Sequence, residues 1–155
     1  GGIYDKKGKG ATIMIIGSFI ILCVHLLFAI PFLHQTVIAF ILMIILGIGF
    51  SLVPSAMWPS VPKIIPERQL GTAYSLIFWV QNWGLMGVPA LIGWVLNKWC
   101  IVKDASNADG TTNYDYTLPM LIFAGFGLLA VLFAFLLKIE DKKKGYGLEL
   151  PNIKK

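Results

Sequence analysis

Charged residues are scarce in this sequence, and its four longest apolar runs contain none. Only 14% of the 155 residues are charged, whereas 57% are hydrophobic and the mean hydropathy is +0.75. Soluble domains usually carry about a quarter charged residues, and a single core of this size cannot hide so much apolar surface. The composition therefore excludes a soluble globular domain and predicts an integral membrane protein with the lipid bilayer as its solvent.

Residues for metal, cofactor or covalent chemistry are also few. The two cysteines, Cys23 and Cys100, are expected to be free thiols, although a disulfide between them stays open. No Cys/His cluster has metal-ligand spacing, and we find no phosphate-binding loop and no nucleophile–base pair. We therefore expect no catalytic residue, no metal, no cofactor and no enzymatic activity.

The net charge of +5 does not form a patch typical of nucleic-acid binding. The basic residues lie at the ends of the apolar runs, a placement that suits an anionic membrane surface. We expect no nucleic-acid partner. The sequence also lacks an initiator Met and a signal peptide, so we expect it to be the later part of a longer protein.

Four apolar runs are long enough to cross a bilayer. We expect transmembrane helices over residues 11–30, 36–58, 70–96 and 118–138. Proline removes a backbone donor and clashes with the preceding turn. The second helix should therefore kink at Pro54 and end between Pro59 and Pro66. The polar segment 97–117 is expected to be a solvated loop.

The distribution of Lys and Arg predicts the orientation. If the N-terminus is cytoplasmic, eleven of the thirteen basic residues fall on the cytoplasmic side. Residues 1–10 would then form a cytoplasmic loop, and residues 139–155 a polar, poorly ordered cytoplasmic tail. The short loops and the lack of an Asn-x-Ser/Thr acceptor in the outer loop indicate a bacterial inner membrane.

Polar side chains within the spans concentrate in the third helix. Gln81 and Asn82 lie roughly 16 Å from its cytoplasmic end, close to the membrane midplane. Amides facing lipid there would leave donors and acceptors unpaired. They therefore either join this helix to a neighbour or line a substrate cavity, and the aromatic residues beside them favour the cavity.

Two further features of the spans are a line of small residues and a single histidine. A line of small residues in the third helix indicates close packing against a neighbouring helix: Gly84, Gly87, Ala90 and Gly93. In the first helix, His25 could relay protons, but a hydrogen-bonded or interfacial histidine is the commoner case. No Asp or Glu falls inside a predicted span.

The first ten residues carry a recognisable motif. The pattern G-x-x-x-D-K-x-G-K is formed by Gly1, Asp5, Lys6, Gly8 and Lys9. It resembles the loop signature that the Major Facilitator Superfamily carries between its eighth and ninth helices. The family usually has one more basic residue where this sequence has a glycine. The resemblance implies a loop that takes part in conformational change.

A second stretch strengthens the resemblance. Residues 56–59, 61–62, 65–74 and 81–85 are similar to the tenth and eleventh helices of the branch that contains the lysosomal dipeptide transporter. The resemblance implies an all-α membrane fold of twelve helices in two halves. The four predicted helices would be the ninth to twelfth, in the C-terminal half. Their partners would be the missing N-terminal helices of the same chain.

The resemblance also implies a function. It indicates transport of a small polar organic solute, with dipeptides as candidates, by alternating access. The residues expected at the substrate cavity or its gate are Trp58, Tyr74, Trp79, Gln81 and Asn82. The alternative, from another class, is a non-transporting four-helix membrane scaffold or subunit.

Overall fold

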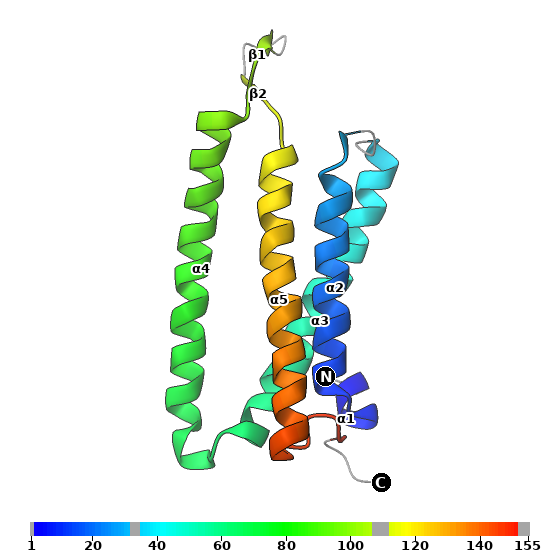
Figure 1. The fold of residues 1–155 in the computed structure, drawn as a ribbon, viewed down its shortest axis with the longest axis vertical. Helices are drawn as coiled ribbons and strands as arrows, with labels where there is room; N and C mark the ends of the chain where they lie inside the picture. Colours follow the sequence, from blue (N-terminus) through cyan, green and yellow to red (C-terminus); the bar gives the residue numbers. More distant parts are fainter. Residues whose placement is uncertain (1, 32–34, 107–111, 152–155) are drawn as a thin grey trace.

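The computed structural model describes residues 2–31, 35–106 and 112–151. It contains four long helices whose length and apolar character suit a membrane span. They run side by side in one elongated bundle (Figure 1). Their bounds are α2 Gly10–Phe28, α3 Thr36–Ile64, α4 Leu70–Trp99 and α5 Thr117–Lys144. The predicted all-α membrane fold is confirmed.

Helix α3 continues through three prolines. Pro54, Pro59 and Pro62 all lie inside it, and it ends at Ile64. Each proline removes one N–H from the helical ladder and leaves the carbonyl four residues earlier without its usual donor. The end of α3 falls within the interval expected from the prolines, and six residues beyond the expected range of 36–58.

Helix α2 lies between α3 and α5 and packs closely against both. A Cβ on Gly17 would lie 2.9 Å from Cγ2 of Val53 and 3.2 Å from the carbonyl oxygen of Gly49. On the other side, a Cβ on Gly127 of α5 would lie 3.0 Å from the Cα of Leu22. Such approaches need residues without a side chain. Helices α2, α3 and α5 thus form a compact three-helix group.

Helix α4 stands apart from this group (Figure 1). All of α4 is described, and Val95 is its only buried residue. Within the described residues, nothing lies within 4 Å of a Cβ built on Gly84, Gly87 or Gly93. The close packing expected of this small-residue line is therefore not made inside the described part of the chain.

The connection from α4 to α5 contains a β-hairpin rather than only a solvated loop. Strand β1, Ile101–Ser106, pairs antiparallel with β2, Thr112–Tyr114. The Asp115 N–H donates to the Cys100 carbonyl at 2.7 Å and closes the base of the hairpin. Burial and the nearby Asp115 carboxylate both raise the pKa of the Cys100 thiol. Cys23 and Cys100 are both free.

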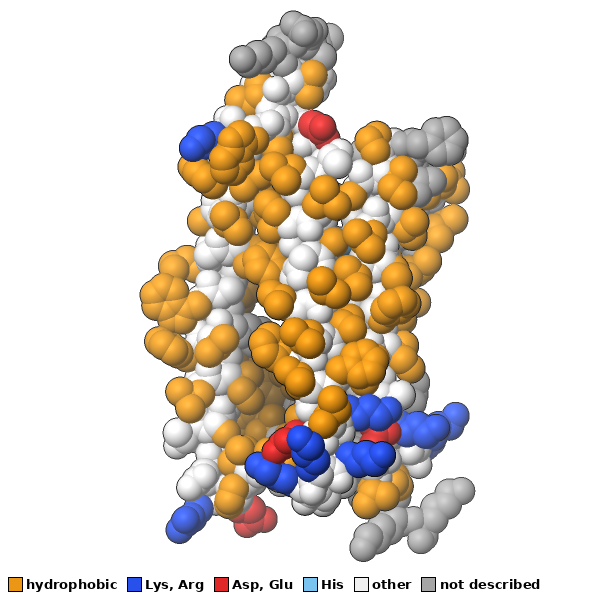
Figure 2. Space-filling model, in the orientation of Figure 1, with side chains coloured by type: hydrophobic (Ala, Val, Ile, Leu, Met, Phe, Trp, Pro, Cys, Tyr) orange, Lys and Arg blue, Asp and Glu red, His pale blue; other side chains and the backbone are white. Residues whose placement is uncertain are grey.

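The opposite end of the bundle, which we call the basic end, carries most of the described Lys and Arg side chains. Figure 2 shows them gathered there, below a surface that is mostly apolar. The start of α2 and the ends of α3 and α5 meet at this end (Figure 1). It also holds a short helix, α1 Gly2–Lys7, and a single-turn helix, η2 Glu67–Gln69, that precedes α4.

The tail after α5 is not the poorly ordered segment that we expected. Helix α5 extends to Lys144, six residues past its predicted end, and Gly145 closes it in the left-handed region with a φ of 68°. The chain then turns back, and Leu148 is completely buried. The tail is ordered as far as the structure describes it because it packs against the start of α2.

Candidate substrate-facing helix and loop motif

Aromatic side chains join the lower half of α4 to the end of α3. The Trp58 ring centroid lies 5.7 Å from that of Tyr74 and 5.0 Å from that of Phe78. The Tyr74 hydroxyl donates to the Trp58 carbonyl at 3.4 Å. This carbonyl is the one that Pro62 leaves without a helical donor. Two predicted site residues, Trp58 and Tyr74, are therefore brought together by the structure.

The two midplane amides follow this aromatic junction on α4. Asn82 donates from Nδ2 to the Phe78 carbonyl at 2.8 Å, so part of its hydrogen-bonding capacity is met within the helix. Gln81 lies about two turns after Tyr74 and shares its helical row. Its side chain makes no hydrogen bond to the described residues. Both amides are exposed in this chain.

Trp79 belongs to a different face of α4. Its ring packs edge-on against that of Trp83, with centroids 6.1 Å apart. Trp79, Asn82, Trp83 and Met86 line a shallow hollow of about 270 Å³. The predicted site residues on α4 thus lie on two neighbouring helical rows. Tyr74 and Gln81 lie on the row that faces α3, and Trp79 lies on the other. Asn82 lies between the two rows.

An apolar groove continues along the first of these rows. It lies between α4 and the three-helix group, has a volume of about 650 Å³, and is lined by Phe50, Leu85, Val88, Ile92 and Phe123, among others. Leu85 and Ile92 continue the helical row of Gln81. The sequence analysis missed this groove, because no pattern in one helix shows which residues of another will face it.

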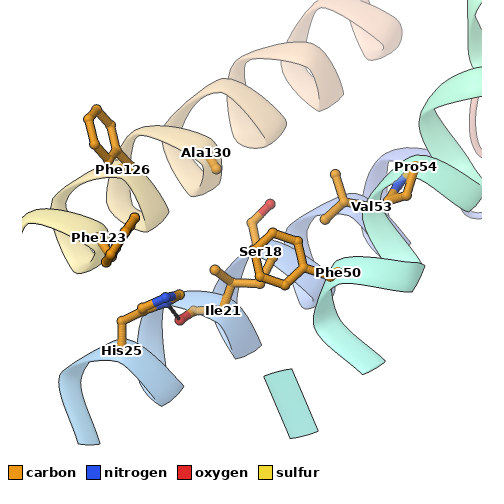
Figure 3. Close-up of a pocket in the computed structure, with 9 residues that line it drawn as sticks. All are labelled: Ser18, Ile21, His25, Phe50, Val53, Pro54, Phe123, Phe126 and Ala130. Carbon is orange, nitrogen blue, oxygen red and sulfur yellow. Dashed lines mark hydrogen bonds between the residues drawn. The ribbon is translucent and has the colours of Figure 1, made fainter. Parts of the chain in front are cut away.

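A second apolar pocket lies between α2, α3 and α5. Figure 3 shows Phe123 of α5 pointing towards His25 of α2 across it. Its volume is about 600 Å³, and it shares Phe50 and Phe123 with the groove beside α4. The two hollows therefore adjoin.

His25 is a hydrogen-bonded histidine, as expected if it does not relay protons. Its Nδ1 lies 2.8 Å from the carbonyl oxygen of Ile21. A carbonyl only accepts, so in the neutral imidazole Nδ1 carries the proton and Nε2 is an acceptor. The ring also packs at 5.4 Å from that of Phe123. The arrangement explains a buried histidine without a proton relay.

The loop motif folds as the short helix α1 followed by two left-handed residues. Gly1 of the motif lies outside the described residues. Asp5 and Lys6 belong to α1, and Gly8 and Lys9 have φ angles of 70° and 63°. The Gly8 N–H donates to the Tyr4 carbonyl at 2.8 Å, which closes the turn. The tight turn expected here is thus preceded by a helical turn.

These features define a polytopic helical membrane protein with a basic, motif-bearing end and polar groups left open on one span. Comparison with known proteins gives the family. The model of the Major Facilitator Superfamily matches residues 1–89, more than half of the chain. The chain belongs to this family, whose members are membrane transporters rather than enzymes, and the predicted resemblance is confirmed.

Curated relatives agree with this assignment. The mouse, chicken and human proteins named lysosomal dipeptide transporter MFSD1 are 36%, 34% and 33% identical to the chain. Each match covers 63% of this chain but only 20–21% of the relative. The match therefore spans about a fifth of the length of these relatives. No solved structure gives a significant match. Relatives named as transporters do not favour the alternative of a non-transporting scaffold.

The predicted bacterial inner membrane is wrong. The relatives are lysosomal transporters of animals, from mouse, chicken and human. The prediction rested partly on the lack of a glycosylation acceptor in the outer loop. A single loop without an acceptor is compatible with either membrane. The integral, multi-pass membrane location stands, with four candidate spans in the described residues.

Proposed function

We propose that this chain forms part of a secondary transporter that moves a small polar organic solute across a membrane by alternating access. Dipeptides are the first candidates, because the relatives are named as dipeptide transporters. The proposal places the four spans as the ninth to twelfth helices of the transporter. It also places both ends of the chain, and hence the basic end, in the cytoplasm.

The observation that carries the proposal is the exposure of two amide side chains near the middle of α4. Gln81 and Asn82 lie near the middle of a 30-residue helix, and this chain leaves both exposed. Amide donors and acceptors that are left without partners are costly in hydrocarbon. They require either protein partners or a water-filled cavity. Beside an aromatic junction and an apolar groove, they give the combination of apolar walls and few polar groups that binds small molecules.

The geometry suggests separate roles for the candidate residues. Tyr74 and Trp58 close the space between α3 and α4 towards the basic end and suit a gate. Gln81 and Asn82 stand above them and suit hydrogen bonding to a polar solute. Further helices of the same protein would cover the groove beside α4 and complete the cavity, with lipid around the outside.

Substitution of the amides in the full-length transporter tests this proposal. Asn82→Ala and Gln81→Ala should each reduce dipeptide uptake into vesicles by about tenfold, the effect of one lost hydrogen bond to a charged solute. Membrane abundance should stay unchanged. Asn97→Ala is a matched control. Asn97 is an exposed amide on the same helix that donates to the Gly93 carbonyl at 2.9 Å, but it lies at the helix end. Equal uptake by all three variants would refute the cavity role.

A further inference from the structure

The two largest of the fully buried side chains in the described chain lie at the basic end, where the tail meets the loop motif. Tyr4 of α1 and Leu148 of the tail are the two largest completely buried side chains, with 1% and 0% of their surface exposed. The tail reaches this place through left-handed residues at Gly145 and Gly147. The Leu148 N–H donates to the buried Asp141 carboxylate at 3.0 Å, which holds the turn against α5.

The tail supplies acceptors to the first turn of α2. The Lys9 N–H donates to the Glu149 carbonyl at 3.0 Å, and the Gly10 N–H donates to the Leu148 carbonyl at 2.8 Å. The first turn of a helix has N–H groups without intrahelical partners. In this helix the N-cap residue, Lys9, makes no side-chain capping bond. The tail therefore caps the N-terminus of α2 in place of a side chain.

The Glu149 side chain completes this cap. Its Oε1 accepts the Thr12 N–H at 3.0 Å, and the Thr12 hydroxyl lies 3.1 and 2.9 Å from its two oxygens. The Lys138 Nζ donates to the same hydroxyl at 2.7 Å. A carboxylate at a helix N-terminus is favoured by the helix dipole as well as by the hydrogen bonds.

The motif glycine is required at the point where the tail crosses it. A Cβ on Gly8 would lie 2.4 Å from the carbonyl oxygen of Glu149, so even the smallest side chain would push the tail away. The φ of 70° at Gly8 separately favours glycine. One motif residue is thus constrained both by its own turn and by the tail.

Helix α3 is held by the same turn. The Lys63 Nζ donates to the carbonyls of Gly147 at 3.0 Å and Leu150 at 2.8 Å. It also lies 4.9 Å from the centroid of the Tyr4 ring. The tail therefore contacts the motif and the ends of α2, α3 and α5, and these contacts join the three-helix group at the basic end.

We propose that residues 145–150 are the positioning element of the loop motif, with Glu149 as the positioning residue. The tail holds the left-handed turn at Gly8 and Lys9, and it keeps the ends of α2, α3 and α5 together as one rigid body while the transporter changes conformation. The effect on transport rests on the proposed function. The docking of the tail does not, and it is tested separately.

The first experiment compares two carboxylates near the end of the chain in the full-length transporter. Glu149→Ala should lower the maximal rate of dipeptide uptake by about tenfold, the effect of losing one charge-assisted contact. The KM should stay unchanged, since Glu149 contacts Thr12 at the basic end and not the midplane amides of α4. Glu140→Ala is the control: it removes the same charge but breaks only an exposed ion pair with Lys144. Equal rates for the two variants, or a raised KM for Glu149→Ala, would overturn the proposal.

The second experiment replaces the contact by a reversible bridge. Thr12→Cys and Glu149→Cys are combined in a transporter without Cys23 and Cys100, and a short bis-methanethiosulfonate reagent links the two thiols. Linking should occur readily and should restore the rate that the unlinked variant has lost, until a reductant cleaves the bridge. Failure to link would disprove the docking. If linking blocks uptake, the tail must detach from α2 during transport, and the proposal of a rigid body is wrong. If the wild-type protein moves no dipeptide, the linking yield still decides the docking.

Discussion

The Tyr74 hydroxyl and the Trp58 carbonyl meet because Pro62 cannot supply the N–H that would normally occupy that carbonyl. At the scale of single residues, Pro62 of α3 thus frees a carbonyl to which Tyr74 of α4 donates. The contact lies at the proposed gate. Its strength should depend on whether the proline is present.

Restoring the helical donor tests this dependence. Tyr74→Phe should lower the melting temperature of the full-length protein in detergent by a few degrees, from a loss of about 1 kcal/mol. In a Pro62→Ala background the same change should have little effect, since the introduced alanine then provides the N–H donor to the Trp58 carbonyl. Pro59→Ala, which supplies no donor to that carbonyl, serves as the comparison. A Tyr74→Phe effect that is the same in all three backgrounds would contradict the coupling.

The candidate site could be predicted only in part, for a physical reason. The depth of Gln81 and Asn82 within the predicted span follows from counting residues along a helix, whereas their exclusion from lipid stays a prediction. The proximity of Trp58 to Tyr74 depends on how α3 crosses α4, which no count along one helix contains. Helical spacing alone puts Trp79 on a different row from Tyr74, and the structure packs its ring against that of Trp83.

At the scale of elements, contacts between backbones decide how the helices are arranged. Helix α5 approaches α2 at Gly127, where a Cβ would come within 3.0 Å of Leu22 Cα. Two residues earlier, nothing described lies within 4 Å of a Cβ at Gly125. The same helix therefore offers two glycines in opposite environments, one packed and one open.

These glycines should respond to substitution with opposite signs. Gly127→Ala should destabilise the protein by about 1–3 kcal/mol, because the new methyl group forces the helices apart. Gly125→Ala should leave stability unchanged or raise it by up to about 1 kcal/mol, since alanine favours the helix. Thermal unfolding of the purified full-length protein measures both. A larger loss at position 125 would show that this packing is wrongly assigned.

The spans were predictable as elements, but the end of α5 and the connections were not. Apolar runs identify helices because lipid forces every backbone group to bond internally. Outside the apolar run that constraint disappears, and local contacts decide. Helix α5 continues to Lys144, with an ion pair of 2.9 Å between Lys144 and Glu140. The tail becomes ordered through Glu149 and Thr12, which are 137 positions apart.

At the scale of the whole molecule, charge is distributed by end. The basic end carries nearly all described Lys and Arg side chains (Figure 2), whereas Lys98 lies in the last turn of α4, next to the hairpin. Basic segments stay preferentially on the cytoplasmic side of a membrane. The proposed orientation therefore has the hairpin between α4 and α5 on the opposite side.

Inserted glycosylation acceptors test this orientation in cells. An Asn-x-Ser acceptor placed in the connection 107–111 should be glycosylated, because that connection would face the lumen. The same acceptor placed after the last residue should remain unmodified on the cytoplasmic side. A mobility shift that an endoglycosidase removes reports the result. Modification of the C-terminal acceptor alone would reverse the assignment.

Helix α4 is the least apolar of the four candidate spans, and the other described residues cover almost none of it. During synthesis, such a segment meets the translocon with midplane amides that α2 and α3 leave uncovered. Its entry into the bilayer would then depend on helices made before it, which hold it until α5 emerges. The polarity that suits α4 to the proposed solute pathway would thus make its insertion into the bilayer the least favourable of the four spans.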